Sequence, residues 1–254
     1  LFLKKYDSPS AQEEYSVALA ANPNHPRALL GLAKALEFDG TGDATGVLQQ
    51  LLEIDPNNVE AHVLLARRYL TREGHEEARE HAEMALVVNP GSLLALTALA
   101  GSHMIAGDMD AFSEVRNQVL AINPRYAEMD ASLAELSVQT RRYRQAVERA
   151  NAAVEIDPLS WEAWGLLGMN ELRLGEVEHG RANLERAFGG DPYNPWFKNS
   201  LDLLDTFERF QTHRTEHFEL FLHETEDELL ATYLAPIAEE AYDSLSRRYG
   251  VEPE

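Results

Sequence analysis

Histidine-containing segments provide the residue types that could bind zinc. His213, Glu216 and His217 have the spacing of the inverted zinc motif His-x-x-Glu-His. That chemistry needs both histidines on one helical face and a further acidic ligand downstream, because a catalytic zinc ion takes three protein ligands and keeps one position open. We predict that this segment instead spans the end of a helix and the start of a strand, and is an exposed linker.

The remaining histidine-glutamate pairs are also incomplete as metal sites. His75-Glu76 and His223-Glu224 lack the second histidine of His-Glu-x-x-His, and the chain contains no cysteine. The lack of cysteine excludes disulfides and thiolate ligands but does not distinguish the cytoplasm from the periplasm. We therefore predict no catalytic residue, no metal site and no cofactor for this chain. Its localisation stays open between cytoplasmic and periplasmic.

The composition argues against two classes of partner. The 254 residues include 22 basic and 43 acidic side chains, which gives a formal net charge of −21. A surface this negative repels phosphate groups, and the basic residues form isolated pairs rather than a patch, so we expect no nucleic-acid binding. No apolar run approaches the length of a membrane span, so we expect none. Because the chain begins with Leu1 rather than Met, we expect it to be a piece of a longer product.

A repeat of 33 or 34 residues organises most of the chain. Asx-Pro pairs recur at Asn22-Pro23, Asp55-Pro56, Asn89-Pro90, Asn123-Pro124, Asp157-Pro158 and Asp191-Pro192. Proline pushes the preceding residue out of the α region and cannot donate the next helical hydrogen bond. Each pair therefore predicts the end of a helix, and a second break in the middle of each unit predicts two helices per repeat.

Leucines and small residues recur at fixed places in this period. Nine residues after each proline stand Leu32, Leu65, Leu99, Leu133, Leu167 and Leu201. In five of the six cases the next residue is small: Ala33, Ala66, Ala100, Ala134 and Gly168. A large residue beside one with only a methyl group or hydrogen is what two closely crossed helices require.

These residues resemble the tetratricopeptide repeat family, whose repeat is a 34-residue helix-turn-helix with this small and large pattern and a closing proline. The resemblance covers residues 1–194, as a partial first repeat and five full repeats. It implies an all-α fold, a right-handed α-solenoid in which the first helix of each repeat lines a concave groove that holds partner proteins. Residues 93–124 depart most from the pattern, with His103, Phe112 and Arg116 at family positions of other types.

The C-terminal part does not follow the repeat. We predict a capping helix over 195–212, which an open solenoid needs to cover its last apolar face. Over 213–254 we predict a strand with alternating Phe218, Leu220 and Leu222, and then a helix to about Tyr249. The apolar stripe expected on that helix contains Leu230, Leu234, Ile237, Ala241 and Leu245. These two elements are predicted to be the start of a truncated second domain.

The tail has a resemblance of its own. NPWFKNSLDLLD, HFELFL and the helical segment that ends in RRYGVEPE look like the junction in bacterial tetratricopeptide proteins that continue into a peptidase MA-like, gluzincin-type domain. The resemblance implies a zinc helix beyond residue 254. The tail itself contains no catalytic motif.

The groove residues follow from the resemblance, which places them four, seven, eleven, fourteen and fifteen residues after each proline. As partner-binding residues we predict Lys34, Phe38, Val63, Arg67, Leu70, Leu94, Met104, Ile105, Glu135, Val138, Met169 and Arg173. The same positions also hold Glu37, Glu60, Thr71, Thr97, Glu128, Gln139 and Glu162. Some of these side chains are expected to pack between neighbouring helices instead, because position in the repeat does not measure exposure.

Three functions are compatible with this pattern. The first is a non-enzymatic scaffold for protein-protein interaction that holds a peptide or helix in its groove. The second is the substrate-recognition arm of a zinc metalloprotease-like enzyme whose catalytic domain lies downstream. The third is a structural element that self-associates, with a homodimer formed through the C-terminal segment.

Overall fold

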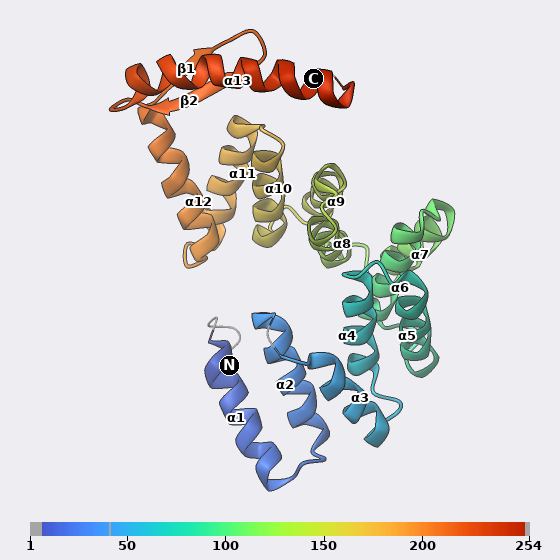
Figure 1. Cartoon of the computed structure of the whole chain (residues 1–254). Coiled ribbons are helices and arrows are strands. Elements are labelled where there is room, and N and C mark those ends of the chain that lie inside the picture. The colour runs from blue at the N-terminus through green and yellow to red at the C-terminus, as the bar shows by residue number, and fades with distance from the viewer. Residues whose placement is uncertain (1–6, 41, 252–254) are drawn as a thin grey trace. The chain divides into compact units, whose positions relative to one another are not determined.

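The computed structural model describes residues 7–40 and 42–251, and it divides into two compact units (Figure 1). The first unit is Leu1–Asn183 and the second is Leu184–Glu254. Helix α11 (Val177–Gly190) crosses the boundary. Within the described residues, no helix combines the length and apolar character that a membrane crossing needs.

The first unit is built from helices in the predicted pairs. They are α1 (Ser8–Ala21), α2 (Pro26–Asp39), α3 (Ala44–Ile54), α4 (Val59–Leu70), α5 (His75–Val88), α6 (Leu93–Ala106), α7 (Met109–Ile122), α8 (Glu128–Gln139), α9 (Tyr143–Ile156) and α10 (Trp161–Arg173). Every second helix ends at the Asx of an Asx-Pro pair, which is the C-cap residue of α1, α3, α5, α7 and α9. The proline that follows prevents each of these helices from continuing.

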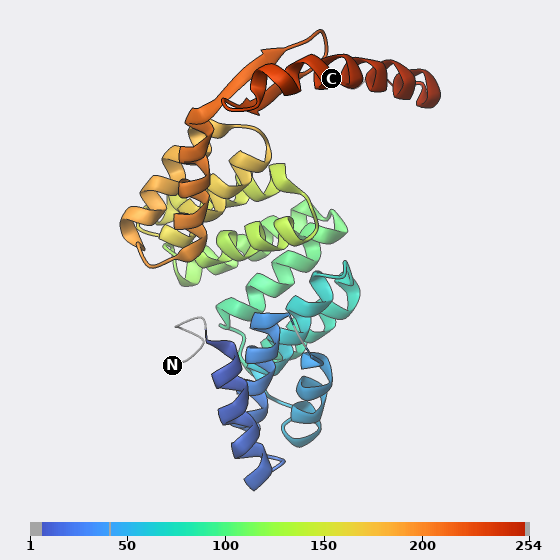
Figure 2. The same cartoon turned by 60° about the vertical axis from the view of Figure 1, so that its left-hand side comes forward.

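The helices stack in chain order, from the blue to the yellow part of Figure 2. In addition to contacts between consecutive helices, α4 contacts α6, α6 contacts α8, and α8 contacts α10. The first helices of successive repeats therefore form a continuous row. The predicted α-solenoid is confirmed.

Small residues allow the helices to approach closely. The second positions of the leucine-small pairs, Ala33, Ala66, Ala100 and Ala134, are at most 1% exposed. In the last repeat a methyl group added to Gly180 would lie 2.7 Å from the Leu172 side chain and 2.8 Å from the Gly168 carbonyl oxygen. Glycine at this position therefore permits a contact between backbones that any side chain would obstruct.

A cluster of charged side chains lies where the repeat that departs from the pattern meets the next repeat. Phe112, which stands where other repeats have a small residue, is buried, and the Arg149 guanidinium lies 5.3 Å above its ring. The Asp130 carboxylate is 1% exposed and accepts hydrogen bonds from Arg116 at 2.9 and 3.1 Å and from Arg149 at 3.1 Å. One carboxylate on α8 thus joins α7 and α9.

Residues 195–212 do not form one helix, so that prediction is wrong. Helix α12 (Pro195–Thr206) is followed by a short 3-10 turn, η2 (Phe207–Arg209), and by strand β1 (Phe210–Arg214). Strand β1 pairs antiparallel with β2 (Glu219–His223), with Thr212 opposite Phe221. We predicted one strand in this region, and the structure contains two, because the backbone groups of β2 are better satisfied by a second strand than left exposed.

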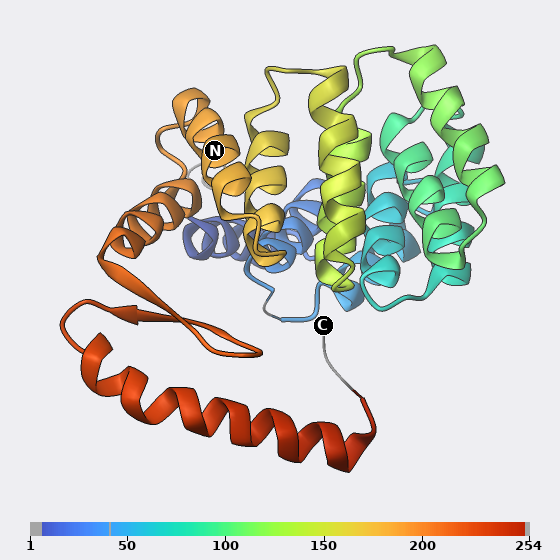
Figure 3. The ribbon, with the colours of Figure 1, turned by 90° about the horizontal axis from the view of Figure 1, so that it is seen from above.

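Helix α13 (Asp227–Tyr249) lies beside the hairpin, in the red part of Figure 3. Its half-buried apolar residues are Leu230, Ala231, Ala235, Ala238 and Tyr242, rather than the whole predicted stripe. Ile237 and Leu245, which belong to the predicted apolar stripe, are 59% and 52% exposed. The two-stranded hairpin is narrow, and the face of α13 that it covers is not the face that carries Ile237 and Leu245.

We expect Leu133→Ala to lower the free energy of unfolding by about 2–5 kcal/mol, the usual cost of removing a buried leucine. Leu133 is 1% exposed in the core of the first unit. Urea denaturation measures the effect. The control Leu159→Ala, at a leucine that is 65% exposed, should change stability by no more than about 0.5 kcal/mol. Equal midpoints for the two variants would contradict the helix register.

We expect Asp130→Ala to cost about 3–5 kcal/mol, because it leaves Arg116 and Arg149 partly buried without their carboxylate. Thermal and urea unfolding measure the loss. Asp202→Ala is the matched control, since Asp202 and its partner Lys198 are each 57% exposed. It should cost no more than about 1 kcal/mol. Similar losses of unfolding free energy in both variants would show that the Asp130 ion pairs stabilise the fold no more than an exposed ion pair does.

Candidate functional site

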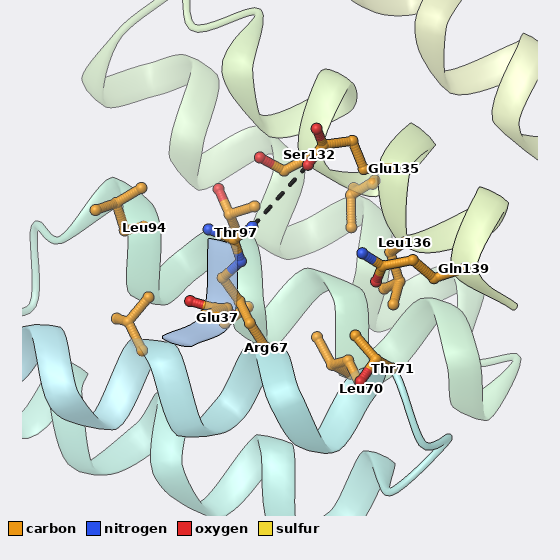
Figure 4. Close-up of a pocket in the computed structure, with 13 residues that line it drawn as sticks. Glu37, Arg67, Leu70, Thr71, Leu94, Thr97, Ser132, Glu135, Leu136 and Gln139 are labelled. Carbon is orange, nitrogen blue, oxygen red and sulfur yellow. Dashed lines mark ion pairs between the residues drawn. The ribbon is translucent and has the colours of Figure 1, made fainter. Parts of the chain in front are cut away.

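A pocket opens on the row of first helices, between α2, α4, α6 and α8 (Figure 4). It contains about 580 Å³ of space that is partly open to solvent. Its lining consists of Glu37, Val63, Arg67, Leu70, Thr71, Leu94, Thr97, Ala98, Ser132, Leu133, Glu135, Leu136 and Gln139. Because first helices of successive repeats contact each other, residues far apart in sequence meet on this surface.

The pocket combines apolar walls with charged groups. Leu70 and Leu136 are at most 6% exposed, so they form fixed walls, whereas Leu94 is 51% exposed at the surface. The Arg67 guanidinium points across the pocket towards Glu135, and the nearest nitrogen and oxygen are 4.0 Å apart (Figure 4). A separation of this length is an ion pair without a hydrogen bond.

The two carboxylates of the pocket are partly removed from water. Burial raises the pKa of Glu135 above its ordinary value of 4.5; Glu162 raises it further, and Arg67 lowers it. Burial also raises the pKa of Glu37, an effect that Arg67 partly offsets. Burial opposes ionisation because the charged form loses hydration. Among the residues that line the pocket, Arg67 is the cation that opposes this effect of burial on the pKa of both carboxylates.

The structure brings five of the twelve predicted groove residues to this pocket: Val63, Arg67, Leu70, Leu94 and Glu135. Glu37, Thr71, Thr97 and Gln139, at other predicted groove positions, also line it. Sequence reasoning missed Ala98, Ser132, Leu133 and Leu136 as pocket residues. Each of these residues is next to a predicted groove position or is a core residue of the repeat. They line the pocket because it lies between helices, where the sides of the helices are reached as well as the face that points into the groove.

The other predicted residues lie outside the pocket. Lys34 is paired with Glu60 at 2.8 Å, and Met104 is 3% exposed in the hydrophobic core and does not line the pocket. Arg173 donates a hydrogen bond to Asn170 at 2.7 Å. Phe38 is exposed on α2, whereas Ile105, Val138 and Met169 are half-buried.

The histidines of the inverted zinc pattern are separated by the hairpin. His213 lies on β1 with its Nε2 3.4 Å from Asp227, whereas His217 lies between the strands and contacts Glu239 at 2.6 Å. The hydrogen bond from His217 lowers the pKa of Glu239 to about 2, and the same bond raises the pKa of His217. Each histidine is thus engaged by a different carboxylate of α13. Across residues 7–40 and 42–251 no group of three or more His, Cys, Asp or Glu side chains is arranged to hold a metal ion.

Comparison with known proteins gives one family and several structures. Residues 132–195 match the tetratricopeptide repeat family. The rice Protein SGT1 homolog (Oryza sativa subsp. japonica) is 29% identical over 93 residues, which are 37% of this chain. That match spans only 25% of the length of the rice protein.

Two solved structures share the fold. A tetratricopeptide repeat protein from Parabacteroides merdae ATCC 43184 is 19% identical, with a TM-score of 0.60 and 80% of each chain covered. A thermophilic protein of the same type from Thermus thermophilus is 18% identical, with a TM-score of 0.54, and the match covers 71% of this chain and 98% of that one. The repeat period, the helix pairs and these matches agree: the chain has the helical-repeat fold of these structures, and its residues 132–195 match the tetratricopeptide repeat family.

Proposed function

We propose that this chain is a non-enzymatic scaffold that holds a peptide or a helix of a partner protein on the row formed by α2, α4, α6 and α8. The observation that carries the proposal is the pocket on that row, where apolar and charged side chains from four helices meet. Binding pockets typically combine mainly apolar walls with a few polar groups that fix orientation. The leucines of this pocket, together with Arg67 and two carboxylates, have that composition.

The energetic state of the charged groups supports the same proposal. Burial makes ionisation of Glu37 and Glu135 unfavourable, so these side chains cost folding free energy in the charged form. Groups whose pKa is raised by burial in a concave site are more frequent at functional sites than elsewhere on a protein surface. A bound partner would compensate this cost.

We expect selection of short random peptides on the folded chain to yield binders that depend on the pocket. The substitution Leu94→Asp places a charge on an exposed apolar wall, and should weaken these peptides about tenfold or more, a loss of about 1.4 kcal/mol. Fluorescence anisotropy measures the affinity.

The matched control is Leu159→Asp, at a leucine that is 65% exposed outside the pocket. It should leave peptide affinity unchanged. Binders that tolerate Leu94→Asp as well as the control would show that the partner surface lies elsewhere, and the proposal would then fail.

For the tail, we propose self-association through α13. Leu229, Tyr233, Ile237, Leu245 and Tyr249 recur at multiples of four residues and are 52–66% exposed. The first turn of α13 is acidic and the last turn is basic. Two copies of α13 packed antiparallel would therefore bring opposite charges together at both ends and cover the apolar side chains.

Light scattering over a range of protein concentrations tests this proposal. We expect the mass to rise towards that of a dimer, and Ile237→Glu to return it to that of a monomer. Thr232→Glu, at an exposed polar position on another face of the same helix, is the control and should keep the dimer. A monomer at every concentration would contradict self-association.

The exposed face of α13 also favours a second candidate function. In a substrate-recognition arm of a metalloprotease-like enzyme, this face would pack against a catalytic domain encoded after residue 254. A His-Glu-x-x-His segment in the gene sequence after Glu254 would support that role, and its absence there would remove it.

A further inference from the structure

The charges of the pocket are unbalanced. Among the residues that line the pocket, Arg67 is the one cation beside Glu37 and Glu135; Arg68 acts on Glu37 from outside the lining, and the carboxylate of Glu162 acts on Glu135. Lys34, another basic residue close to Glu37, forms a 2.8 Å ion pair with Glu60. The pocket therefore has an excess of negative charge that its own cations do not neutralise.

The carboxylates also lack hydrogen-bond donors. Arg67 approaches Glu135 only to 4.0 Å, and in the described part of the chain neither the Glu37 nor the Glu135 carboxylate accepts a hydrogen bond. Partly buried carboxylates without donors are costly, and donors from a ligand gain more there than at a fully hydrated surface. The pocket is thus suited to a group that brings both positive charge and N–H donors.

The walls of the pocket select the shape of that group. Val63, Leu70 and Leu136 are at most 6% exposed and present aliphatic surface beside the carboxylates. A small hydrated cation gains nothing from such surface. Lysine and arginine side chains have an aliphatic stem that packs on apolar walls and a charged end that reaches a carboxylate.

We propose that the pocket binds a lysine or arginine side chain of the partner peptide, with its charged end between Glu37 and Glu135 and its aliphatic stem against Leu70 and Leu136. This inference rests on the proposed function of the groove. It specifies a partner segment that is basic and amphipathic. Arg67 would then set the depth of entry, because it repels a cation that moves past the two carboxylates.

The peptides selected on the folded chain provide the test. We expect lysine or arginine to be enriched at one fixed position. Glu135→Gln and Glu37→Gln should each weaken these peptides about tenfold, and Arg67→Gln should strengthen binding by removing the competing cation. Calorimetry at two salt concentrations should show weaker binding at higher salt, since the contact is between charges.

The matched control is Glu155→Gln, at an exposed glutamate of α9 that does not line the pocket, and it should leave affinity unchanged. Circular dichroism confirms that each variant is folded. Enrichment of aspartate or glutamate in the selected peptides, or unchanged affinity in both Glu37→Gln and Glu135→Gln, would overturn the proposal of a basic partner segment. If Leu94→Asp still weakened those peptides, the proposal that the groove binds a partner would stand. Peptides insensitive to Leu94→Asp would overturn the proposed function itself.

Discussion

The close approach of neighbouring helices is the constraint on which the rest of the structure depends. Helices can pack tightly only where small residues lie between them, as the fully buried Ala66 and Ala100 do in one core cluster. If these positions carried larger side chains, α4, α6 and α8 would lie further apart and their direct contacts would be lost. The pocket exists because these three helices meet. The geometry of the pocket therefore depends on buried alanines that do not line it.

The repeat around Phe112 satisfies the same constraint by different means. A large aromatic residue takes the place of a small one, and the neighbouring helices are joined by Asp130 with Arg116 and Arg149. Both carboxylate oxygens accept hydrogen bonds from charged donors, which makes the buried charge acceptable. This solution is more sensitive to substitution than apolar packing, because losing one partner leaves buried charges behind.

The sequence predicted the parts of the fold that local chemistry determines. Asx-Pro pairs end helices wherever they occur, and the leucine and small residues identified the core, so the helical repeats could be predicted. The sequence did not reveal the Asp130 cluster, because its partners are 14 and 19 residues away on other helices. The hairpin was missed for a related reason: strand β1 exists because β2 pairs with it, and its own sequence is also compatible with a helix. For the candidate site, the repeat register placed Arg67 and Glu135 on the correct helices, but the burial of Met104 depends on how neighbouring helices cover it.

The carboxylate that joins α7, α8 and α9 also determines how the array opens. In a linear array each repeat contacts only its neighbours, so amide hydrogens at the ends exchange with solvent before those in the middle. Because Asp130 is bonded to Arg116 and Arg149, we expect these three consecutive helices to exchange as one cooperative unit. Of the two carboxylates that line the pocket, Glu135 lies on α8, within that unit, and Glu37 lies on α2, outside it. A ligand that touches both residues links two parts of the chain that otherwise open separately, so its binding slows exchange in helices that it never contacts.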